Sequence, residues 1–330
     1  MTSWIAVVGG LALLLVGGEL LVRGSVQVAT RLGVSPLVIG LTLVGFGTST
    51  PELVASLQAA LSGAPGIAYG NIVGSNIANI LLILGASAVI GPIAVQSRTL
   101  KRDGLAMVAT ALAFAIVAIA IPPARWIGAA FIALLGLYIY SAFRQEKAVV
   151  VADHGAVYDK AQATRQADPA LAAPAAGPRL PVALATALAG LAIIIVGGYF
   201  LVEGAVGVAR DFGVSETVIG LTIVAVGTSM PELVTSLVAA ARRQSDVALG
   251  NIIGSNIYNI LGIGGVTALI APSGIPDRIV TFDNPVMVAV SLAVVAMAYT
   301  GARISRWEGG LLLAAYAGYI AWLWPKAAGG

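Results

Sequence analysis

The sequence predicts an all-α polytopic membrane protein whose ten transmembrane helices form two inverted repeats of five. Of its 330 residues, 58% are hydrophobic and only 10% are charged, whereas a soluble domain has about 25% charged residues. A helix that crosses a bilayer needs about 20 apolar residues, so this length allows roughly ten crossings with short loops. An internal repeat supplies the second half of the prediction.

Apolar segments separated by polar residues define the expected helices. They are 4–29, 35–62, 67–91, 103–121 and 126–145 in a first repeat (residues 1–145), and 180–209, 215–241, 246–271, 284–301 and 307–324 in a second (residues 180–330). The polar stretch 146–179 cannot bury a core and is expected to be a linker. The first segment lacks a preceding positive charge and is too long for a cleaved signal, so we expect a membrane helix.

A shift of 180 residues lays the second half of the chain on the first. The matching stretches are 33–57 with 213–237, identical at 18 of 25 positions, and 70–81 with 250–261, identical at 10 of 12. Arg98 and Asp103 also align with Arg278 and Asp283. Because five helices are an odd number, the second copy must enter the membrane from the opposite side. Inverted repeats of this kind are typical of secondary transporters, whose substrate site lies near the midplane between the repeats.

The distribution of Lys and Arg predicts the orientation. With the N-terminus outside, fourteen cationic residues fall on inward-facing loops and helix ends, and four fall outside. The inward set is Arg23, Arg31, Arg98, Lys101, Arg102, Arg144, Lys147, Lys160, Arg165, Arg179, Arg242, Arg243, Arg303 and Arg306; the outward set is Arg125, Arg210, Arg278 and Lys326. This bias predicts that both termini lie outside and that the 146–179 loop is cytoplasmic.

Several function classes are excluded by what the chain lacks. There is no cysteine, hence no disulfide and no thiolate metal site. The single histidine, His154, lies in the polar loop, and no Gly-Lys pair exists to form a phosphate-binding loop. We therefore expect no enzyme, no bound cofactor, no nucleotide and no nucleic-acid partner, and we attribute the net charge of +3 to loops that orient the protein.

Two carboxylates stand near the middle of otherwise apolar stretches. Glu52 and Glu232 occupy equivalent positions in helices 2 and 7, and no Lys or Arg within these stretches neutralises them. A charge at this depth costs about 2.5–3.5 kcal/mol on insertion scales. Such a pair calls for a cation or a proton.

The residues around the two glutamates favour a cation. Pro51 and Pro231 cannot donate a backbone hydrogen bond, so we expect helices 2 and 7 to break and to free the carbonyls of Gly47 and Gly227. Hydroxyl groups flank the expected breaks, at Thr48, Ser49, Thr228 and Ser229. A donor set made only of oxygen suits Ca²⁺ and Na⁺, whereas zinc and copper prefer nitrogen and sulfur.

Helices 3 and 8 carry a second repeated motif, Gly-Asn-x-x-Gly-Ser-Asn-x-x-Asn, at 70–79 and 250–259. Ser75 and Asn79 share one helix face, as do Ser255 and Asn259, and we expect their oxygens to reach the same cavity. Breaks are expected in these two helices as well. The glycines favour close helix packing. For Asn71, Asn76, Asn251 and Asn256, two roles stay open: holding a helix break or contacting ions.

These paired motifs resemble the alpha repeats of the sodium/calcium exchanger family, within the cation/calcium antiporter superfamily. The resemblance covers nearly the whole membrane part and implies a prokaryotic inner-membrane protein with ten helices and alternating access. It also implies the ion ligands: Glu52, Glu232, Thr48, Ser49, Thr228, Ser229, Ser75, Ser255, Asn79 and Asn259, with backbone carbonyls at Gly45 and Ala225.

One departure from the family pattern affects the charge of the site. Family members often carry Asp at one of the positions matching Asn79 and Asn259, whereas both are Asn here. The site then has two formal negative charges, which suffice for one Ca²⁺ but put sodium stoichiometry and potassium dependence in doubt. The 146–179 loop is also too short for the regulatory calcium-binding domains of animal relatives.

The sequence therefore predicts an antiporter that exchanges Ca²⁺ for Na⁺, most simply Ca²⁺ extrusion, with the lipid bilayer as its surroundings. Helices 1 and 6 are the expected moving elements, with Gly17-Gly18 and Gly197-Gly198 as flexible points. H⁺-coupled Ca²⁺ exchange is the first alternative, although the proton-coupled branch usually has an extra glutamate after Gly-Asn. A cation channel is the second alternative, since it uses similar oxygens.

Overall fold

The structure is a computed structural model that describes residues 2–31, 45–95, 100–121, 124–148, 179–241, 243 and 245–323, which are almost entirely helical. The first half contains α1 (Thr2–Arg31), α3 (Gly45–Thr48), α4 (Thr50–Leu61), α5 (Pro65–Ala78), η2 (Asn79–Leu84), α6 (Gly85–Ile90), η3 (Leu100–Gly104), α8 (Leu105–Ala120) and α9 (Arg125–Ala148). The second contains α11 (Leu180–Phe212), α12 (Glu216–Ile219), η5 (Gly220–Val224), α13 (Ala225–Thr228), α14 (Met230–Ala241), α15 (Ser245–Ile257), η6 (Tyr258–Gly264), α16 (Gly265–Ile270), η7 (Ile279–Asp283), α17 (Asn284–Gly301) and α18 (Arg306–Leu323). The η elements are π-helical turns that continue into the next α-helix. Two short strands, β1 (Ile93–Ala94) and β2 (Arg303–Ile304), pair antiparallel.

Every expected apolar segment coincides with a helical run, except that residues 35–44 lie outside the described residues. The helix α9 extends to Ala148, slightly into the expected linker, whose remainder 149–178, with His154, is also outside them. In the described ranges, six helices are long and apolar enough to cross a membrane, and a bent pair makes a seventh. An all-helical polytopic protein is therefore confirmed, and the count of ten spans stays a prediction.

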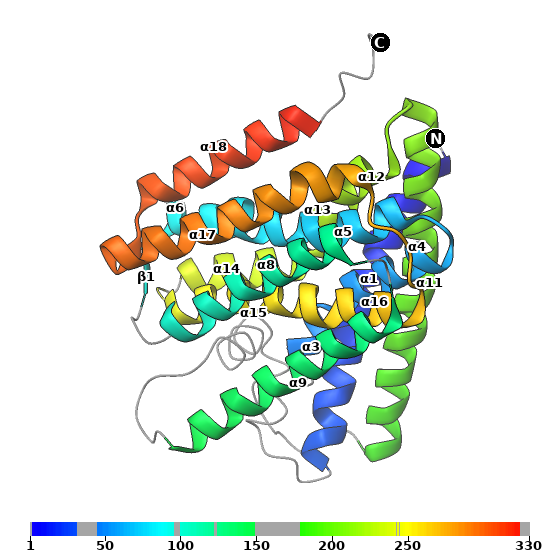
Figure 1. Ribbon diagram of the computed structural model, residues 1–330. Coiled ribbons are helices and arrows are strands. Elements are labelled where there is room, and N and C mark those ends of the chain that lie inside the picture. Colours follow the sequence, from blue (N-terminus) through cyan, green and yellow to red (C-terminus); the bar gives the residue numbers. More distant parts are fainter. Residues whose placement is uncertain are drawn as a thin grey trace.

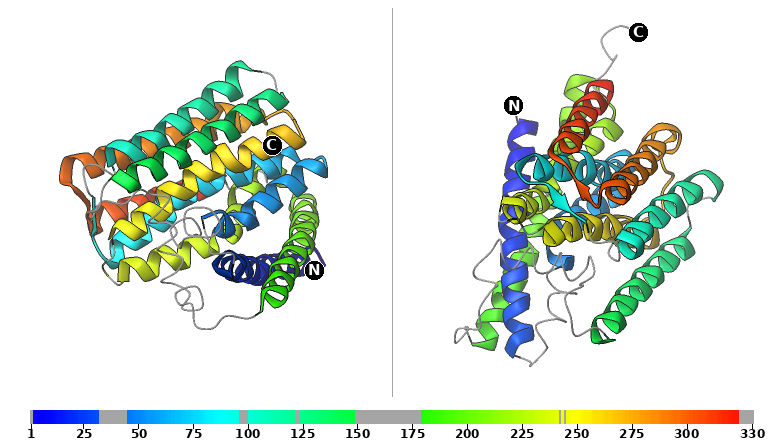
Figure 2. Two further views of the ribbon diagram at one scale, coloured as in Figure 1. Left: turned by 90° about the horizontal axis from the view of Figure 1, so that it is seen from below. Right: turned by 90° about the vertical axis from the view of Figure 1, so that its left-hand side faces the viewer.

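The helices form a buried centre and an apolar periphery. The spans Pro65–Ile90 and Ala248–Ile270 are each 83% buried, whereas the other four are between 22% and 33% buried. Figures 1 and 2 show α1 and α11 side by side, crossing the remaining helices at a steep angle. Large hydrophobic side chains on the outer helices are exposed, among them Ile5, Ile119 and Leu188. A surface of this kind is stable against lipid, and the protein is an integral membrane protein.

Helices 2 and 7 are interrupted where the prolines predict it. Ser49 (φ −91°, ψ 7°) separates α3 from α4, and Ser229 (φ −83°, ψ 11°) separates α13 from α14. At the second break the two parts of the helix are bent by 51°. The next residues along the chain include Pro51 and Pro231, which suit the first turn of a new helix because they need no hydrogen-bond acceptor there.

The expectation of breaks in helices 3 and 8 was wrong. Residues Pro65–Ile90 run as one helix, as do Ser245–Ile270. Each instead contains a π-helical turn, η2 and η6, that begins at or beside an asparagine, Asn79 or Asn259. A π-helical turn adds a residue to the helix without ending it and is frequent at functional sites. The helix accommodates its polar residues by this local widening.

Glycines hold α1 and α11 in close backbone contact. They recur at intervals of seven on both helices, and each faces the partner helix: Gly10, Gly17 and Gly24 on α1, and Gly190, Gly197 and Gly204 on α11. A methyl group added at Gly10 would lie 2.5 Å from the backbone nitrogen of Leu201, and one at Gly17 would lie 2.8 Å from that of Ile194. Gly17-Gly18 and Gly197-Gly198 lie inside unbroken helices, where Gly17 and Gly197 pack against the partner helix. Their role as flexible points stays a prediction.

We expect Gly190→Leu to lower the thermal unfolding temperature in detergent and the yield of folded protein. Its added carbon would meet the carbonyl oxygen of Gly17 at 2.8 Å, and overpacking of this kind costs about 1–3 kcal/mol or more. Gly9→Leu is the control, because no atom lies within 4 Å of the carbon added there. Equal melting temperatures for the two variants would contradict the close α1–α11 contact.

Candidate cation site

The two central carboxylates lie where the interrupted helices resume. Glu52 is in the first turn of α4 and Glu232 is in the first turn of α14, and their exposed fractions are 2% and 1%. The start of a helix presents unpaired backbone N–H groups and a partial positive charge, which stabilise a nearby carboxylate. The proline-induced breaks thus place each carboxylate at a helix N-terminus inside the bundle.

Serines from opposite repeats join the two breaks. Ser229 donates a hydrogen bond to Glu52 Oε1 at 3.0 Å, and Ser49 donates to Glu232 Oε1 at 3.4 Å. Each serine occupies the break of one repeat and binds the carboxylate of the other. Ser255 from α15 also donates to Glu232 Oε1, at 3.3 Å. The breaks are therefore adjacent in space and related by the repeat.

Asn71 and Asn251 hold the two glutamate segments from the neighbouring helix. Asn71 Nδ2 donates to the backbone carbonyl of Glu52 at 3.1 Å and to Ser56 Oγ at 2.9 Å. Asn251 Nδ2 repeats both bonds, to the Glu232 carbonyl at 3.2 Å and to Ser236 Oγ at 2.8 Å. Of the two roles left open for these asparagines, the structure contains the first, since they anchor the restarted helix.

Further predicted oxygens gather around the same place. Ser75 donates at 3.4 Å to the carbonyl of Ala225, the first residue of α13. Thr228 donates to Asn71 Oδ1 at 3.1 Å, and Ser75 donates to the same atom at 3.3 Å. In the first repeat, Gly45 begins α3 at the position equivalent to Ala225.

Several buried polar atoms near the site have no hydrogen-bond partner among the described residues. They are Thr48 Oγ1, Asn79 Oδ1, Asn251 Oδ1 and both side-chain polar atoms of Asn259. Asn79 Nδ2 donates to Asn256 Oδ1 at 3.0 Å. Leaving a buried polar group unsatisfied costs about 1–3 kcal/mol. A bound cation, with its ordered water, satisfies such oxygens, and the all-oxygen donor set fits Na⁺ or Ca²⁺.

The remaining buried carboxylates are neutralised by cationic side chains. Asp103 forms a salt bridge with Arg102 at 2.9 Å, and Asp283 forms one with Arg278 at 3.6 Å. Each also accepts a tyrosine hydrogen bond, from Tyr138 at 3.2 Å and Tyr319 at 2.9 Å respectively. Sequence reasoning missed the tyrosines because they are 181 residues apart, one more than the repeat shift. Within the described ranges, no three His, Cys, Asp or Glu side chains form a metal-binding group.

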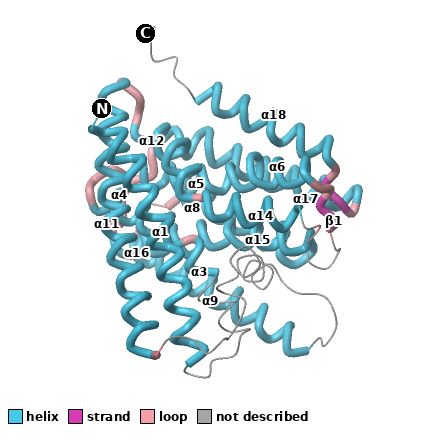
Figure 3. The backbone as a smooth tube through the Cα atoms, turned by 180° about the vertical axis from the view of Figure 1, so that it is seen from behind, coloured by secondary structure: helices cyan, strands magenta, loops and turns pink. Residues whose placement is uncertain are grey.

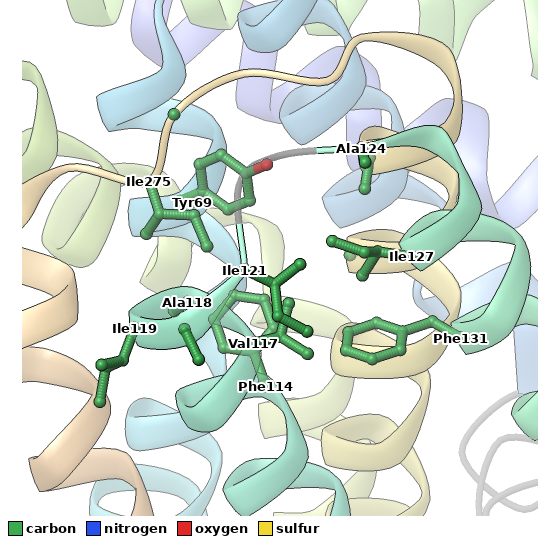
Figure 4. A pocket seen from close by; sticks show the side chains of 14 residues that line it. Tyr69, Phe114, Val117, Ala118, Ile119, Ile121, Ala124, Ile127, Phe131 and Ile275 are labelled. Carbon is green, nitrogen blue, oxygen red and sulfur yellow. The ribbon is translucent and has the colours of Figure 1, made fainter.

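A separate cavity of about 380 Å³ lies toward one end of the bundle, between α5, α8, α9 and α16. Figure 4 shows it lined by aliphatic and aromatic side chains, including Phe114, Phe131 and Ile275. The one hydroxyl that it contains belongs to Tyr69, which donates to the carbonyl of Ser273 at 3.1 Å. This apolar lining does not supply ligands for a cation.

Comparisons with known proteins identify the family of this chain. A family model described as sodium/calcium exchanger protein matches residues 2–144 and 182–324. The chain belongs to the sodium/calcium exchanger family. This membership confirms the resemblance drawn from the repeated motifs, and the family consists of transporters rather than enzymes.

Two similar proteins span almost the same length. The chain is 39% identical to the putative antiporter CaxA of Alkalimonas amylolytica, over 97% of this chain and 98% of that protein. It is 35% identical to the sodium/calcium exchanger MaX1 of Methanosarcina acetivorans, over 94% and 95% respectively. Among solved structures, the sodium-calcium exchanger NCX_Mj soaked with Na⁺ and Sr²⁺ is similar, with a TM-score of 0.63, 32% identity, and coverage of 97% and 98%.

We expect Asn251→Ala to destabilise this exchanger even without Ca²⁺. The substitution removes both donors that hold the Glu232 carbonyl and Ser236, at a cost of about 1–3 kcal/mol for each buried group left unpaired. Thermal unfolding in Ca²⁺-free detergent measures it. Asn251→Ala leaves the Ser236 hydroxyl without its donor, and Ser236→Ala removes that hydroxyl. The loss of stability in the double variant should therefore be smaller than the sum of the losses in the two single variants. Additive losses would contradict the bond.

Proposed function

We propose that this protein exchanges Ca²⁺ for Na⁺ across the inner membrane of a prokaryote, with Ca²⁺ moving outward. The observation that carries the proposal is the buried pair Glu52 and Glu232. Each glutamate accepts a hydrogen bond from a serine of the other repeat. Two carboxylates in a medium of low dielectric constant need about two positive charges nearby. The predicted hydroxyl, amide and carbonyl oxygens complete a hard-cation site.

Competition for this site accounts for exchange. One Ca²⁺ neutralises the two carboxylates, and Na⁺ ions neutralise them equally well, but the same oxygens cannot hold both at once. A cycle in which the empty, doubly charged site cannot cross the membrane couples the two flows. The first alternative is coupling to H⁺, because a buried carboxylate is neutralised by a proton as well.

The arrangement of the loops supports ten helices with inverted repeats and the proposed orientation. Segments predicted to lie in the cytoplasm meet at one end of the bundle. The strands β1 and β2 pair there, Arg306 donates to the carbonyl of Ile90 at 3.2 Å, and Ser245 donates to that of Pro92 at 3.4 Å (Figure 3). The beginning of α1 and the end of α18 lie toward the opposite end in Figure 1, as termini on the outer side require.

An asymmetry in the structure supports alternating access. Gly18 on α1 and Gly198 on α11 both face α4: carbon atoms added there would meet Pro51 at 3.6 Å and Val54 at 2.6 Å. Val234, the repeat equivalent of Val54, is 52% exposed on α14. We infer that the α1–α11 pair moves as one body, covering α4 in this conformation and α14 in the opposite one.

Transport is tested by ⁴⁵Ca²⁺ uptake into proteoliposomes loaded with Na⁺. We expect uptake to require internal Na⁺, to survive proton uncouplers, and to fall by at least about two orders of magnitude in Glu52→Gln and Glu232→Gln, since each removes half the charge of the site. Glu203→Gln is the control, because that carboxylate is exposed on α11. Uptake driven by a pH gradient without Na⁺ would replace this proposal with proton coupling, and flux without a counter-ion would indicate a channel.

Cysteine pairs test the movement, since the chain has no cysteine of its own. The carbon added at Gly198 lies 3.7 Å from Val54 Cβ, close to the spacing of about 3.8 Å in disulfides. We expect Gly198→Cys with Val54→Cys to cross-link in the present conformation. The repeat-equivalent pair, Gly18→Cys with Val234→Cys, should cross-link only in the opposite one.

Each cross-link should abolish Ca²⁺ uptake and a reducing agent should restore it, because a locked α1–α11 pair cannot alternate. Saturating Na⁺ or Ca²⁺ on one side should shift the cross-linking yield between the two pairs in opposite directions. Formation of both disulfides in the same molecules, with uptake unchanged, would contradict movement of this pair.

A further inference from the structure

We propose that the cytoplasmic end of this exchanger carries a binding site for a phosphate group, formed by Arg243 and Arg306. The two arginines border a cavity of about 460 Å³ between the ends of α6 and α14 and the start of α18. The rest of the lining is Ile90, Gly91, Pro92, Ala240 and Ala241. The cavity borders the C-terminal end of α14, whereas Glu232 lies in the first turn of that helix, and the function of the cavity does not depend on which ions are exchanged. The proposal of a phosphate site rests only on the proposed orientation of the protein in the membrane.

Both guanidinium groups have donors available to a ligand. Arg306 uses one N–H for the carbonyl of Ile90, and a guanidinium has five. The Arg243 side chain is exposed and makes no hydrogen bond or ion pair with any of the described residues. Its backbone N–H donates to the carbonyl of Ala240 at 3.0 Å. Planar guanidinium groups bind carboxylates and phosphates alike through two parallel hydrogen bonds, and a phosphate group has enough acceptor oxygens to bind two guanidinium groups at once.

The backbone at Arg243 indicates that its placement is not incidental. Its φ is 58°, in the left-handed region, and among the described residues only Ala302 shares this property without being glycine. The equivalent turn in the first repeat has Gly63, with φ 74°, the residue that adopts this conformation without strain. The second repeat therefore keeps the same turn but replaces a favourable glycine with an arginine at a cavity.

The fixed charges around the cavity remain positive after the helix ends are counted. The C-termini of α6 and α14 each contribute about −0.5 charge, and the N-terminus of α18 contributes about +0.5. Glu308 in the first turn of α18 accepts from the backbone N–H of Ser305 and adds a charge of −1. Together with the two arginines the sum is about +0.5, which still attracts an anion. Phosphate groups reach this end of a membrane protein in two forms, as the headgroups of anionic lipids in the inner leaflet and as soluble phosphate compounds.

Binding is tested on the purified exchanger in detergent, with phosphatidylglycerol, phosphatidylcholine and inorganic phosphate as separate probes. We expect phosphatidylglycerol to bind more tightly than phosphatidylcholine, and Arg243→Gly and Arg306→Gln each to weaken it about fivefold. Arg303→Gln is the matched control: it removes the same charge at the same end, from the exposed strand β2, outside the cavity lining.

Arg243→Gly also tests the strain, because it should keep or raise the melting temperature without lipid while losing the lipid response. Binding of inorganic phosphate that depends on the same two arginines would support the site and assign it a soluble ligand. Equal lipid affinity for wild type, Arg243→Gly and Arg306→Gln, or an equal loss in Arg303→Gln, would overturn the proposal. These measurements need no transport, so their failure is distinct from failure of Ca²⁺ exchange.

Discussion

The structure depends on one constraint: two carboxylates lie inside a bundle of low dielectric constant, where a charge is costly. Every neighbouring feature serves either to hold them or to supply oxygens beside them. The prolines end one helix and start another, which puts each carboxylate at a helix N-terminus. The serines of the two breaks then cross between repeats, so that neither glutamate can move without affecting the segment that carries the other. A site built in this way is completed by cations, and its two halves belong to two copies of the same unit.

Much of this could be predicted from the sequence because the repeat tests every assignment twice. A lone Glu in an apolar stretch has many explanations, but Glu52 and Glu232 share their prolines, serines and spacing, and chance does not repeat such a combination. The membrane class followed from composition, and the breaks at Ser49 and Ser229 followed from proline chemistry. Family membership, which the comparisons establish, followed from the two duplicated motifs. The ligand roles of the individual oxygens are still proposals, since hydrogen bonds among them do not identify an ion.

The sequence was less informative where tertiary packing decides between local alternatives. Glycine allows bending and close approach equally well, and only the neighbouring backbone shows that Gly17 and Gly197 serve close approach. The motif at 70–79 suggested a break, yet the helix continues through a π-helical turn, because polar side chains are accommodated by neighbouring helices rather than by an interruption. The tyrosines that bind Asp103 and Asp283 escaped detection for a different reason: one extra residue in the last helices displaces them from the repeat register.

The two repeats are nearly identical in sequence at the site but not in surroundings, and this difference has mechanistic weight. The two repeats offer the α1–α11 pair two equivalent positions, one over α4 and one over α14. A molecule in a single conformation must adopt one of them, and the exposure of Val234 beside the coverage of Val54 agrees with the alternating access that we propose. The close glycine contacts meet the other requirement of this proposal, a cover that moves as one piece, because helices whose backbones touch at six glycines cannot separate cheaply. In the alternating-access cycle that we propose, inverted duplication supplies both end states from one set of residue types.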